Sequence, residues 1–223
     1  MPSEVRFRIF KDPVSATTHF IGFLAALVAA ALLVRLAAPD PPKLVAMAIY
    51  GGALVTLFGA SSFYHFFDLG DGGNRWLRRL DHAAIFLLIA GTSVPPLLLL
   101  LDGAWRIGFL AAVAALALAG VVFKLAWIDC PDWLGVALYL GMGWLALVPA
   151  QWIVPQLSHG ALAWLVAGGA AYTLGAAIYA RGWPDPWPGR FGHHEIWHCF
   201  VLAGAAAHYA FTWTLLDLPP PAL

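Results

Sequence analysis

Charged side chains are scarce in this sequence. Only 11% of its 223 residues are Asp, Glu, Lys or Arg, whereas 61% are hydrophobic. An ordinary soluble domain carries about 25% charged residues, so this composition excludes that class and indicates a membrane protein. The 12 basic and 12 acidic residues balance. A net charge of zero says nothing about partners. We expect membrane lipids around the chain and no nucleic acid.

Cysteines are equally scarce, with only Cys130 and Cys199 in the whole sequence. One falls in a predicted loop and the other inside a predicted helix, so we expect no disulfide framework. Internal repeats, low-complexity tracts and long linkers are missing as well. The sequence therefore predicts a single domain over residues 1–223, with loops too short to hold a soluble module.

Long uncharged runs make up most of the chain. A bilayer core of about 30 Å needs roughly 20 apolar residues per helix, and six runs approach or exceed that length. They cover residues 13–34, 44–67, 82–101, 107–123, 133–180 and 196–216. The fifth run is too long for one helix. It divides at PAQWIVPQLSHG (149–160), where two prolines, a glycine and polar residues predict a turn.

The predicted fold class is an all-α integral membrane protein, a bundle of seven transmembrane helices. The first run follows basic residues, as a signal peptide does, but it is longer than a signal h-region and six spans follow it. We therefore expect it to remain in the protein. The predicted helices cover residues 14–36, 43–67, 80–101, 105–127, 132–150, 159–180 and 194–216.

The basic residues predict the orientation, because lysine and arginine in short loops are retained in the cytoplasm. Those on the side of the N-terminus are Arg6, Arg8, Lys11, Arg75, Arg78, Arg79, Lys124, Arg181 and Arg190. Those on the opposite side are Arg35, Lys43 and Arg106. We therefore expect a cytoplasmic N-terminus and a C-terminus outside.

Most of the histidines are predicted to lie in one layer near the cytoplasmic side. This layer contains His19, His65, Asp81, His82, His193, His194 and His198, whereas His159 and His208 lie outside it. Polar groups are costly to bury in a bilayer, so they usually face the bundle interior and find partners there. A metal ion is the simplest partner that several imidazoles could share.

Spacing narrows the choice of ligands. His194 and His198 are the only histidines four residues apart, and such residues project from one face of a helix. A catalytic zinc site needs a third protein ligand and an open position, and His65 lies at the matching depth on another helix. Ser61 precedes His65 by four residues and shares its helix face.

The string HEIWH (194–198) also satisfies the H-E-x-x-H pattern, in which the glutamate is the general base of a soluble metalloprotease. The surroundings argue against that fold, because the helix of such a protease is not a membrane span. The match alone therefore does not assign a role to Glu195.

Three motifs together resemble the signature regions of the hemolysin III family. They are SSFYH (61–65), RLDHAAIFLLIAGTSVP (79–95) and HHEIWHCFVLAGAAAHY (193–209). This family is the bacterial branch of the progestin and adipoQ receptor superfamily, which includes the adiponectin receptors and is related to alkaline ceramidases. THFIG (18–22) also resembles the opening motif of the family, although the asparagine that often precedes it is missing.

The resemblance implies a seven-helix fold with a cytoplasmic N-terminus, in the inner membrane of a bacterium. It also implies a Zn²⁺ ion held near the cytosolic side by His65, His194 and His198. An aspartate that approaches the metal through water corresponds to Asp81. The position of Glu195 is not acidic in the adiponectin receptors, so we prefer Asp81 as the general base.

The chemistry implied by the resemblance is hydrolysis of a lipid amide or ester, with ceramide-like lipids as the substrate class. Asp81 would take the proton of the attacking water, and Ser61 would hydrogen-bond that water or the developing oxyanion. Zinc is favoured by three imidazoles with an open position, but iron or nickel would also accept them. The sequence leaves the oligomeric state open.

Two other functions remain as alternatives. The first is a non-catalytic sensor of membrane state, in which a structural zinc ties helices together and lipid binding shifts a conformational equilibrium. The second, suggested by the family name, is a pore-forming cytolysin. It has the least support, because a toxin needs export whereas seven spans indicate a resident membrane protein.

Individual residues also have structural interpretations. Asp81 could pair with Arg78 or Arg79, and His19 and His82 are more typical of polar packing than of ligands. We expect His193 to be exposed, because it lies one residue off the ligand face. His208 lies about 15 Å of helix rise beyond His198 and cannot share its metal.

Overall fold

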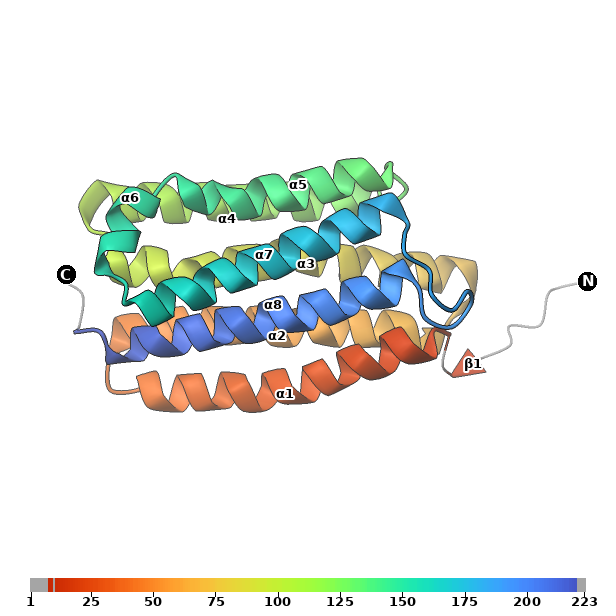
Figure 1. Ribbon diagram of the computed structural model, residues 1–223, viewed down its shortest axis with the longest axis horizontal. Coiled ribbons are helices and arrows are strands. Elements are labelled where there is room, and N and C mark those ends of the chain that lie inside the picture. Colours follow the sequence, from red (N-terminus) through yellow and green to blue (C-terminus); the bar gives the residue numbers. More distant parts are fainter. Residues whose placement is uncertain (1–7, 10, 220–223) are drawn as a thin grey trace, which may run out of the picture.

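The computed structural model describes residues 8–9 and 11–219 and is almost entirely helical (Figure 1). Its helices run side by side along the long axis of the molecule. The long helices are α1 (Pro13–Ala37), α2 (Pro41–Phe66), α3 (Gly70–Leu100), α4 (Gly103–Ala126), α5 (Asp132–Trp144), α7 (His159–Arg181) and α8 (His193–Thr214). The short elements are β1 (Arg8–Ile9), β2 (Phe67–Asp68), η1 (Leu145–Leu147), α6 (Ala150–Ile153), η2 (Val154–Gln156) and η3 (Leu215–Asp217).

The predicted seven-span bundle is confirmed, with one span in an unexpected form. Six helices are each long and apolar enough to cross a membrane. The remaining span, the fifth along the chain, is a broken one, in which Asp132–Leu147 and Ala150–Gln156 meet at an angle of 41°. The sequence predicted one helix over 132–150 followed by a turn. Pro149 and Pro155 explain the difference, because each lacks the amide hydrogen that a continuous helix needs at that position.

α3 begins ten residues before its predicted start at residue 80. The additional turns carry Asp71, Arg75 and Arg78, so they are too polar to belong to an uncharged run. Asn74 stabilises this start, because its side chain accepts a hydrogen bond from the Leu69 amide at 2.9 Å. The segment from Gly70 is therefore a helical extension of the span beyond its apolar part.

Local sequence signals define several helix ends. Asp40 precedes Pro41 at the start of α2, and its carboxylate accepts a hydrogen bond from the Lys43 amide at 3.2 Å. Ser158 caps α7 in the same way through the Ala161 amide, at 3.1 Å. α7 ends at Gly182, whose φ of 61° is the left-handed conformation that glycine adopts without strain.

Apolar side chains line both the inside and the outside of the bundle. Tyr50 and Phe211 are fully buried, whereas Ile107 and Leu118 are 70% and 66% exposed. Large apolar side chains at such exposure are unusual on a soluble monomer and are typical of a surface that faces lipid. Close helix contacts rely on small residues: a Cβ at Gly51 of α2 would lie 2.7 Å from Ala30 of α1.

The arrangement places the beginning of α8 beside the beginning of α1 and the end of α2. Ser15 contacts Glu195 at 3.1 Å, and the Asp12 amide donates to the His65 carbonyl at 3.1 Å. At the other end of the bundle, Lys43 donates to the Leu216 carbonyl at 2.8 Å. Residues of the first, second and seventh spans therefore meet in one layer at one end of the bundle.

The orientation of this layer remains a prediction, and thiol labelling tests it. Gly72 and Gly160 are exposed near opposite ends of the bundle, and a Cβ on Gly72 would meet no atom within 4 Å. In a protein lacking Cys130 and Cys199, we expect Gly160→Cys to react with a membrane-impermeant reagent in intact cells. Gly72→Cys should react only after permeabilisation, and the reverse pattern would invert the predicted topology.

Candidate metal site

The three predicted metal ligands lie close together in the structure. Each of His65, His194 and His198 offers one ring nitrogen, and these nitrogens all lie within 4.8 Å of one another. The Nε2 atoms of His65 and His194 are 3.5 Å apart. His65 and His198 are only 2% and 3% exposed. The end of α2 and the first turns of α8 therefore build a compact, buried imidazole cluster.

The hydrogen bonds of His65 fix which of its nitrogens faces the cluster. Its Nδ1 atom lies 2.9 Å from Oδ2 of Asp12. Because an ionised carboxylate only accepts hydrogen bonds, Nδ1 carries the ring proton and donates to Asp12. The Nε2 atom is left with a lone pair, which points toward Nε2 of His194. An imidazole held by a carboxylate on its far side is the usual arrangement of a metal-ligating histidine.

The donor set fits a tetrahedral ion such as zinc. Two ligand nitrogens at about 2.0–2.1 Å from one ion would lie about 3.3 Å apart at the tetrahedral angle, close to the 3.5 Å between His65 and His194. In the part of the chain that the structure describes, Nδ1 of His198 is buried without a hydrogen-bond partner. The three imidazoles could therefore hold a metal ion and leave a fourth position open.

Asp12 is a site residue that the sequence analysis missed. It directly precedes α1, outside the span, and the hydrogen bond from His65 lowers the pKa of its carboxyl group. Charged residues outside the apolar runs carry information mainly on topology. The Asp12–Pro13 step at the start of the span that carries His19 was the available signal, because it places a carboxylate at the depth of the histidine layer.

A second polar group lies directly beside the imidazole cluster. Ser61 Oγ is 2.7 Å from Nδ1 of His19, and the carboxylate of Asp81 is buried beside Ser61 and His65. The His19 ring stacks on His198, with centroids 3.7 Å apart. α1, α2, α3 and α8 thus each supply a polar side chain to one layer.

Asp81 does not form the ion pair with Arg78 or Arg79 that the sequence left open as its structural role. Arg78 lies 3.4 Å from the Asp129 carboxylate, and Arg79 lies over the ring of Trp76 at 4.9 Å. Asp81 itself forms no ion pair within the described ranges. Its polar neighbours include His65 and Ser61, so its carboxylate lies next to the histidine layer.

Glu195 has a structural role at the start of α8. Its Oε2 atom accepts a hydrogen bond from the Gly192 amide at 2.8 Å, and its Oε1 atom accepts one from Ser15 at 3.1 Å. Both oxygens are thus occupied in capping α8 and joining it to α1. This arrangement supports the interpretation that the H-E-x-x-H match is incidental.

The remaining histidines stay outside the ligand group. His82 is half-buried, and its backbone carbonyl accepts a hydrogen bond from Tyr139 at 3.1 Å. The expectation that His193 is exposed was wrong, because its ring is half-buried against Tyr179, with centroids 6.2 Å apart. His208 lies elsewhere, stacked on Tyr172.

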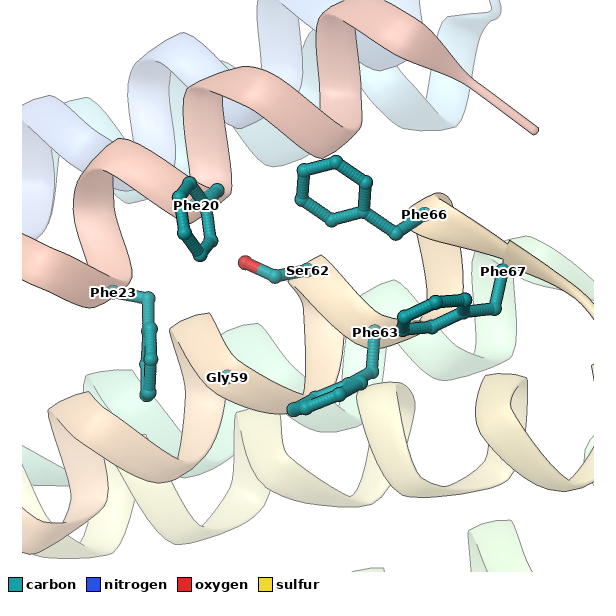
Figure 2. A pocket seen from close by; sticks show the side chains of 7 residues that line it. All are labelled: Phe20, Phe23, Gly59, Ser62, Phe63, Phe66 and Phe67. Atoms are coloured by element: carbon teal, nitrogen blue, oxygen red, sulfur yellow. The ribbon is translucent and has the colours of Figure 1, made fainter. Parts of the chain in front are cut away.

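A separate apolar cleft of about 240 Å³ lies between α1 and α2 (Figure 2). Phe20 and Phe23 project into it from α1, and Phe63 and Phe66 project from α2. Phe20 and Phe66 directly follow His19 and His65 in the sequence. The cleft therefore lies at the depth of the imidazole cluster, but on a different face of α1 and α2. Its phenyl rings suit an acyl chain better than a polar group.

Asp12→Asn tests the contact that orients His65. We expect zinc affinity to fall about 10–100-fold, because an amide no longer accepts the Nδ1 proton as strongly and the His65 ring is less well held. Equilibrium dialysis against a zinc chelator measures this change. Asp40→Asn is the matched control, since Asp40 also precedes a proline at a helix start but lies at the opposite end of the bundle. Equal affinities for the two variants would contradict the assignment of Asp12.

Comparison with known proteins extends over almost the whole chain. A family model described as Haemolysin-III related matches residues 7–209. The chain is 34% identical to the Hemolysin-3 homolog of Bacillus subtilis (strain 168), over 91% of this chain and 93% of that protein. It is 32% identical to Hemolysin-3 of Bacillus cereus, over 86% and 85% of the two chains.

A more distant similarity reaches an animal receptor. The chain is 28% identical to the adiponectin receptor protein of Drosophila melanogaster, over 91% of this chain and 50% of that protein. Together these similarities confirm the resemblance read from the three sequence motifs. The chain therefore belongs to the haemolysin-III-related family of multi-pass membrane proteins, within the progestin and adipoQ receptor superfamily.

Proposed function

We propose that this protein is a zinc-dependent intramembrane hydrolase that acts on lipid amides or esters. The observation that carries the proposal is the position of the buried Ser61–Asp81 pair beside three imidazoles that could hold a metal. A purely structural metal would not require a carboxylate that is buried next to the ligands without an ion-pair partner. A carboxylate in that position is what a general base needs.

His65, His194 and His198 would hold the zinc ion, which, when bound, would polarise the substrate carbonyl and lower the pKa of water toward neutrality. Asp81 would accept the proton of the attacking water. It would then pass that proton to the nitrogen or oxygen that leaves when the acyl bond breaks. Asp81 begins and ends the reaction ionised, so the proton balance closes.

Ser61 has a role that depends on its contact with His19. If Nδ1 of His19 carries the proton, it donates to Ser61 Oγ across the 2.7 Å contact. The Ser61 proton is then free to point at Asp81 or at the carbonyl oxygen of the substrate as negative charge develops there. His19 is therefore a positioning residue, because it acts on the substrate only through Ser61.

A lipid is the proposed substrate class because of where the site lies. The imidazole cluster is at one end of the bundle within its spans, and the outer surface at that depth includes the phenylalanine-lined cleft. A lipid acyl group in the adjacent leaflet would reach this depth without leaving the membrane. The relation of the superfamily to alkaline ceramidases favours amides, and the bacterial relatives favour the inner membrane as the location.

A zinc-clamped sensor is the second candidate, and one observation favours it. The clustered residues come from α2 and α8, with Asp12 at the start of α1, so that a bound ion would join segments far apart in the sequence. A metal that ties these helices could couple the membrane to a conformational equilibrium without any turnover. A cytolytic role has no such support in the geometry.

The experiment that tests the proposal combines metal analysis with a hydrolysis assay. We expect purified protein to contain about one zinc per chain, as a three-histidine site requires, and to release fatty acid from a panel of ceramide-like amides and esters. A chelator should abolish the release, and added zinc should restore it. Bound zinc with no turnover of any lipid in the panel would favour the sensor.

A further inference from the structure

A second cluster of buried polar groups lies between α2, α7 and α8, well away from the candidate metal site. His208 and Thr212 of α8 are 8% and 0% exposed and lie four residues apart, on one helix face. The Tyr172 ring of α7 stacks on His208 with centroids 5.6 Å apart, and Tyr50 of α2 is fully buried nearby. Ten residues of helix rise separate His208 from His198, about 15 Å.

Three polar atoms of this cluster lack hydrogen-bond partners. They are Nδ1 of His208, the hydroxyl of Tyr172 and Oγ1 of Thr212, and each is buried without a partner among the residues that the structure describes. The Tyr50 hydroxyl reaches the Ala205 carbonyl only at 3.5 Å. Unsatisfied polar groups are expensive in a membrane interior, so three at one place indicate a missing partner.

The hydroxyl of Thr212 differs from other hydroxyls of the bundle. Thr56, Thr92 and Thr173 each donate to the carbonyl four residues earlier, at 2.7–2.8 Å, and so satisfy themselves within their own helix. Thr212 has the same bond within reach through the His208 carbonyl but does not form it. Its hydroxyl lies near the Tyr50 hydroxyl of α2, but no hydrogen-bond partner lies within 3.5 Å of it among the described residues.

Two glycines make room for the rings of the cluster. A Cβ at Gly168 would lie 2.5 Å from the His208 ring, and a Cβ at Gly204 would lie 2.9 Å from the Tyr172 ring. Any larger residue at either position would displace these rings. The two glycines thus let α7 and α8 approach closely while the rings of Tyr172 and His208 lie between them.

The chemistry of the cluster selects the class of occupant. In the described part of the chain, neither Tyr172 nor His208 forms an ion pair or a cation–π contact. A cation would lack a carboxylate, and an anion would lack a lysine or arginine. Hydroxyls and one neutral imidazole both donate and accept, so they match a small neutral group with the same capacity.

We propose that Tyr172, His208 and Thr212 form a second polar binding site inside the membrane. Its occupant is a neutral group that both donates and accepts hydrogen bonds, supplied by a water molecule or by the hydroxyl of a lipid. One such oxygen bridging the three unpaired atoms would satisfy all of them at once, as buried waters commonly do. This site goes beyond the proposed hydrolase activity and does not depend on it.

Tyr172→Phe and Thr212→Val test the site, because each removes one oxygen and almost no volume. With an occupant in place, each variant loses a hydrogen bond, and we expect the Tm in detergent to fall by about 2–4 °C. Without an occupant, each variant removes an unsatisfied group, and the Tm should stay the same or rise. An unchanged or raised Tm for both variants would overturn the proposal.

Thr173→Val and Tyr209→Phe are the matched controls. Thr173 adjoins Tyr172 but bonds to the Gly169 carbonyl of its own helix, and Tyr209 adjoins His208 but is only half-buried. Both should leave the Tm nearly unchanged. Zinc content should be equal in all four variants, since the cluster is about 15 Å from the nearest proposed ligand, so this result is independent of the metal-site experiments.

Delipidation separates the two sources of the occupant. If water fills the site, the Tm difference between wild type and Thr212→Val should persist after exhaustive exchange into lipid-free detergent. If a lipid hydroxyl fills it, the difference should vanish on delipidation and return when lipid extract from the host membrane is added back. A difference that is absent under both conditions would contradict the site.

Discussion

Replacing His65, His194 or His198 with alanine is expected to abolish zinc binding and to lower thermal stability. A site with three protein ligands loses affinity steeply when one imidazole is removed, because binding free energy is shared among few bonds. A bound ion would also stabilise the folded state by mass action and would join α2 to α8. Metal analysis of purified variants and their Tm with and without added zinc measure both effects.

Other histidines of the chain provide the controls for this result. His159→Ala, at the start of α7, and His208→Ala should both retain zinc, since neither belongs to the group of ligands. His19→Ala is a stricter control, because His19 stacks on His198 without sharing the cluster of ligand atoms. The ligand set would be wrong if His208→Ala emptied the site while His65→Ala remained loaded.

The apolar parts of the fold were predictable because the bilayer imposes a simple rule. A span must be about 20 residues long and nearly free of charge, and each of the seven predicted spans meets that rule in the structure, the fifth as a bent pair. The rule does not apply to polar residues. It therefore could not predict that α3 starts at Gly70, where Asp71 and Arg75 lie on a helix outside the apolar run.

The grouping of the three histidines was predictable for a different reason. The i, i+4 spacing of His194 and His198 is a local property of one helix, and the depth of His65 follows from span boundaries. The contacts of Asp12 and Ser15 with α2 and α8 depend on how α1 packs, which no periodicity encodes. Sequence patterns therefore predicted the ligand group, whereas the residues that support it required the structure.

Asp81→Asn separates a catalyst from a clamp, because it removes a proton acceptor but none of the proposed ligands. In a hydrolase, the variant should keep most of its zinc while turnover of a ceramide-like substrate falls about 10²-fold or more, the usual contribution of a general base. Asparagine retains the shape and the hydrogen-bonding oxygen that Ser61 can reach. The loss should therefore reflect proton transfer and leave the fold intact.

Glu195→Gln is the matched control for Asp81→Asn. Both changes turn a carboxylate near the imidazole cluster into an amide, but Glu195 is occupied with Gly192 and Ser15. We expect it to lower stability slightly, through a weaker cap on α8, and to leave turnover within a few-fold of wild type. A soluble-protease type of mechanism would predict the opposite order of losses for the two variants.

Complementation of a deletion strain decides between the two functions in the cell. A hydrolase requires Asp81, so the Asp81→Asn protein should fail to complement although its zinc is bound. A clamp requires only the metal, so the same protein should complement fully, while a His65→Ala protein should not. Zinc content, lipid hydrolysis and complementation measured together on these variants therefore give different patterns for the two proposals. Full complementation by a zinc-loaded Asp81→Asn protein would refute the hydrolase and leave the sensor.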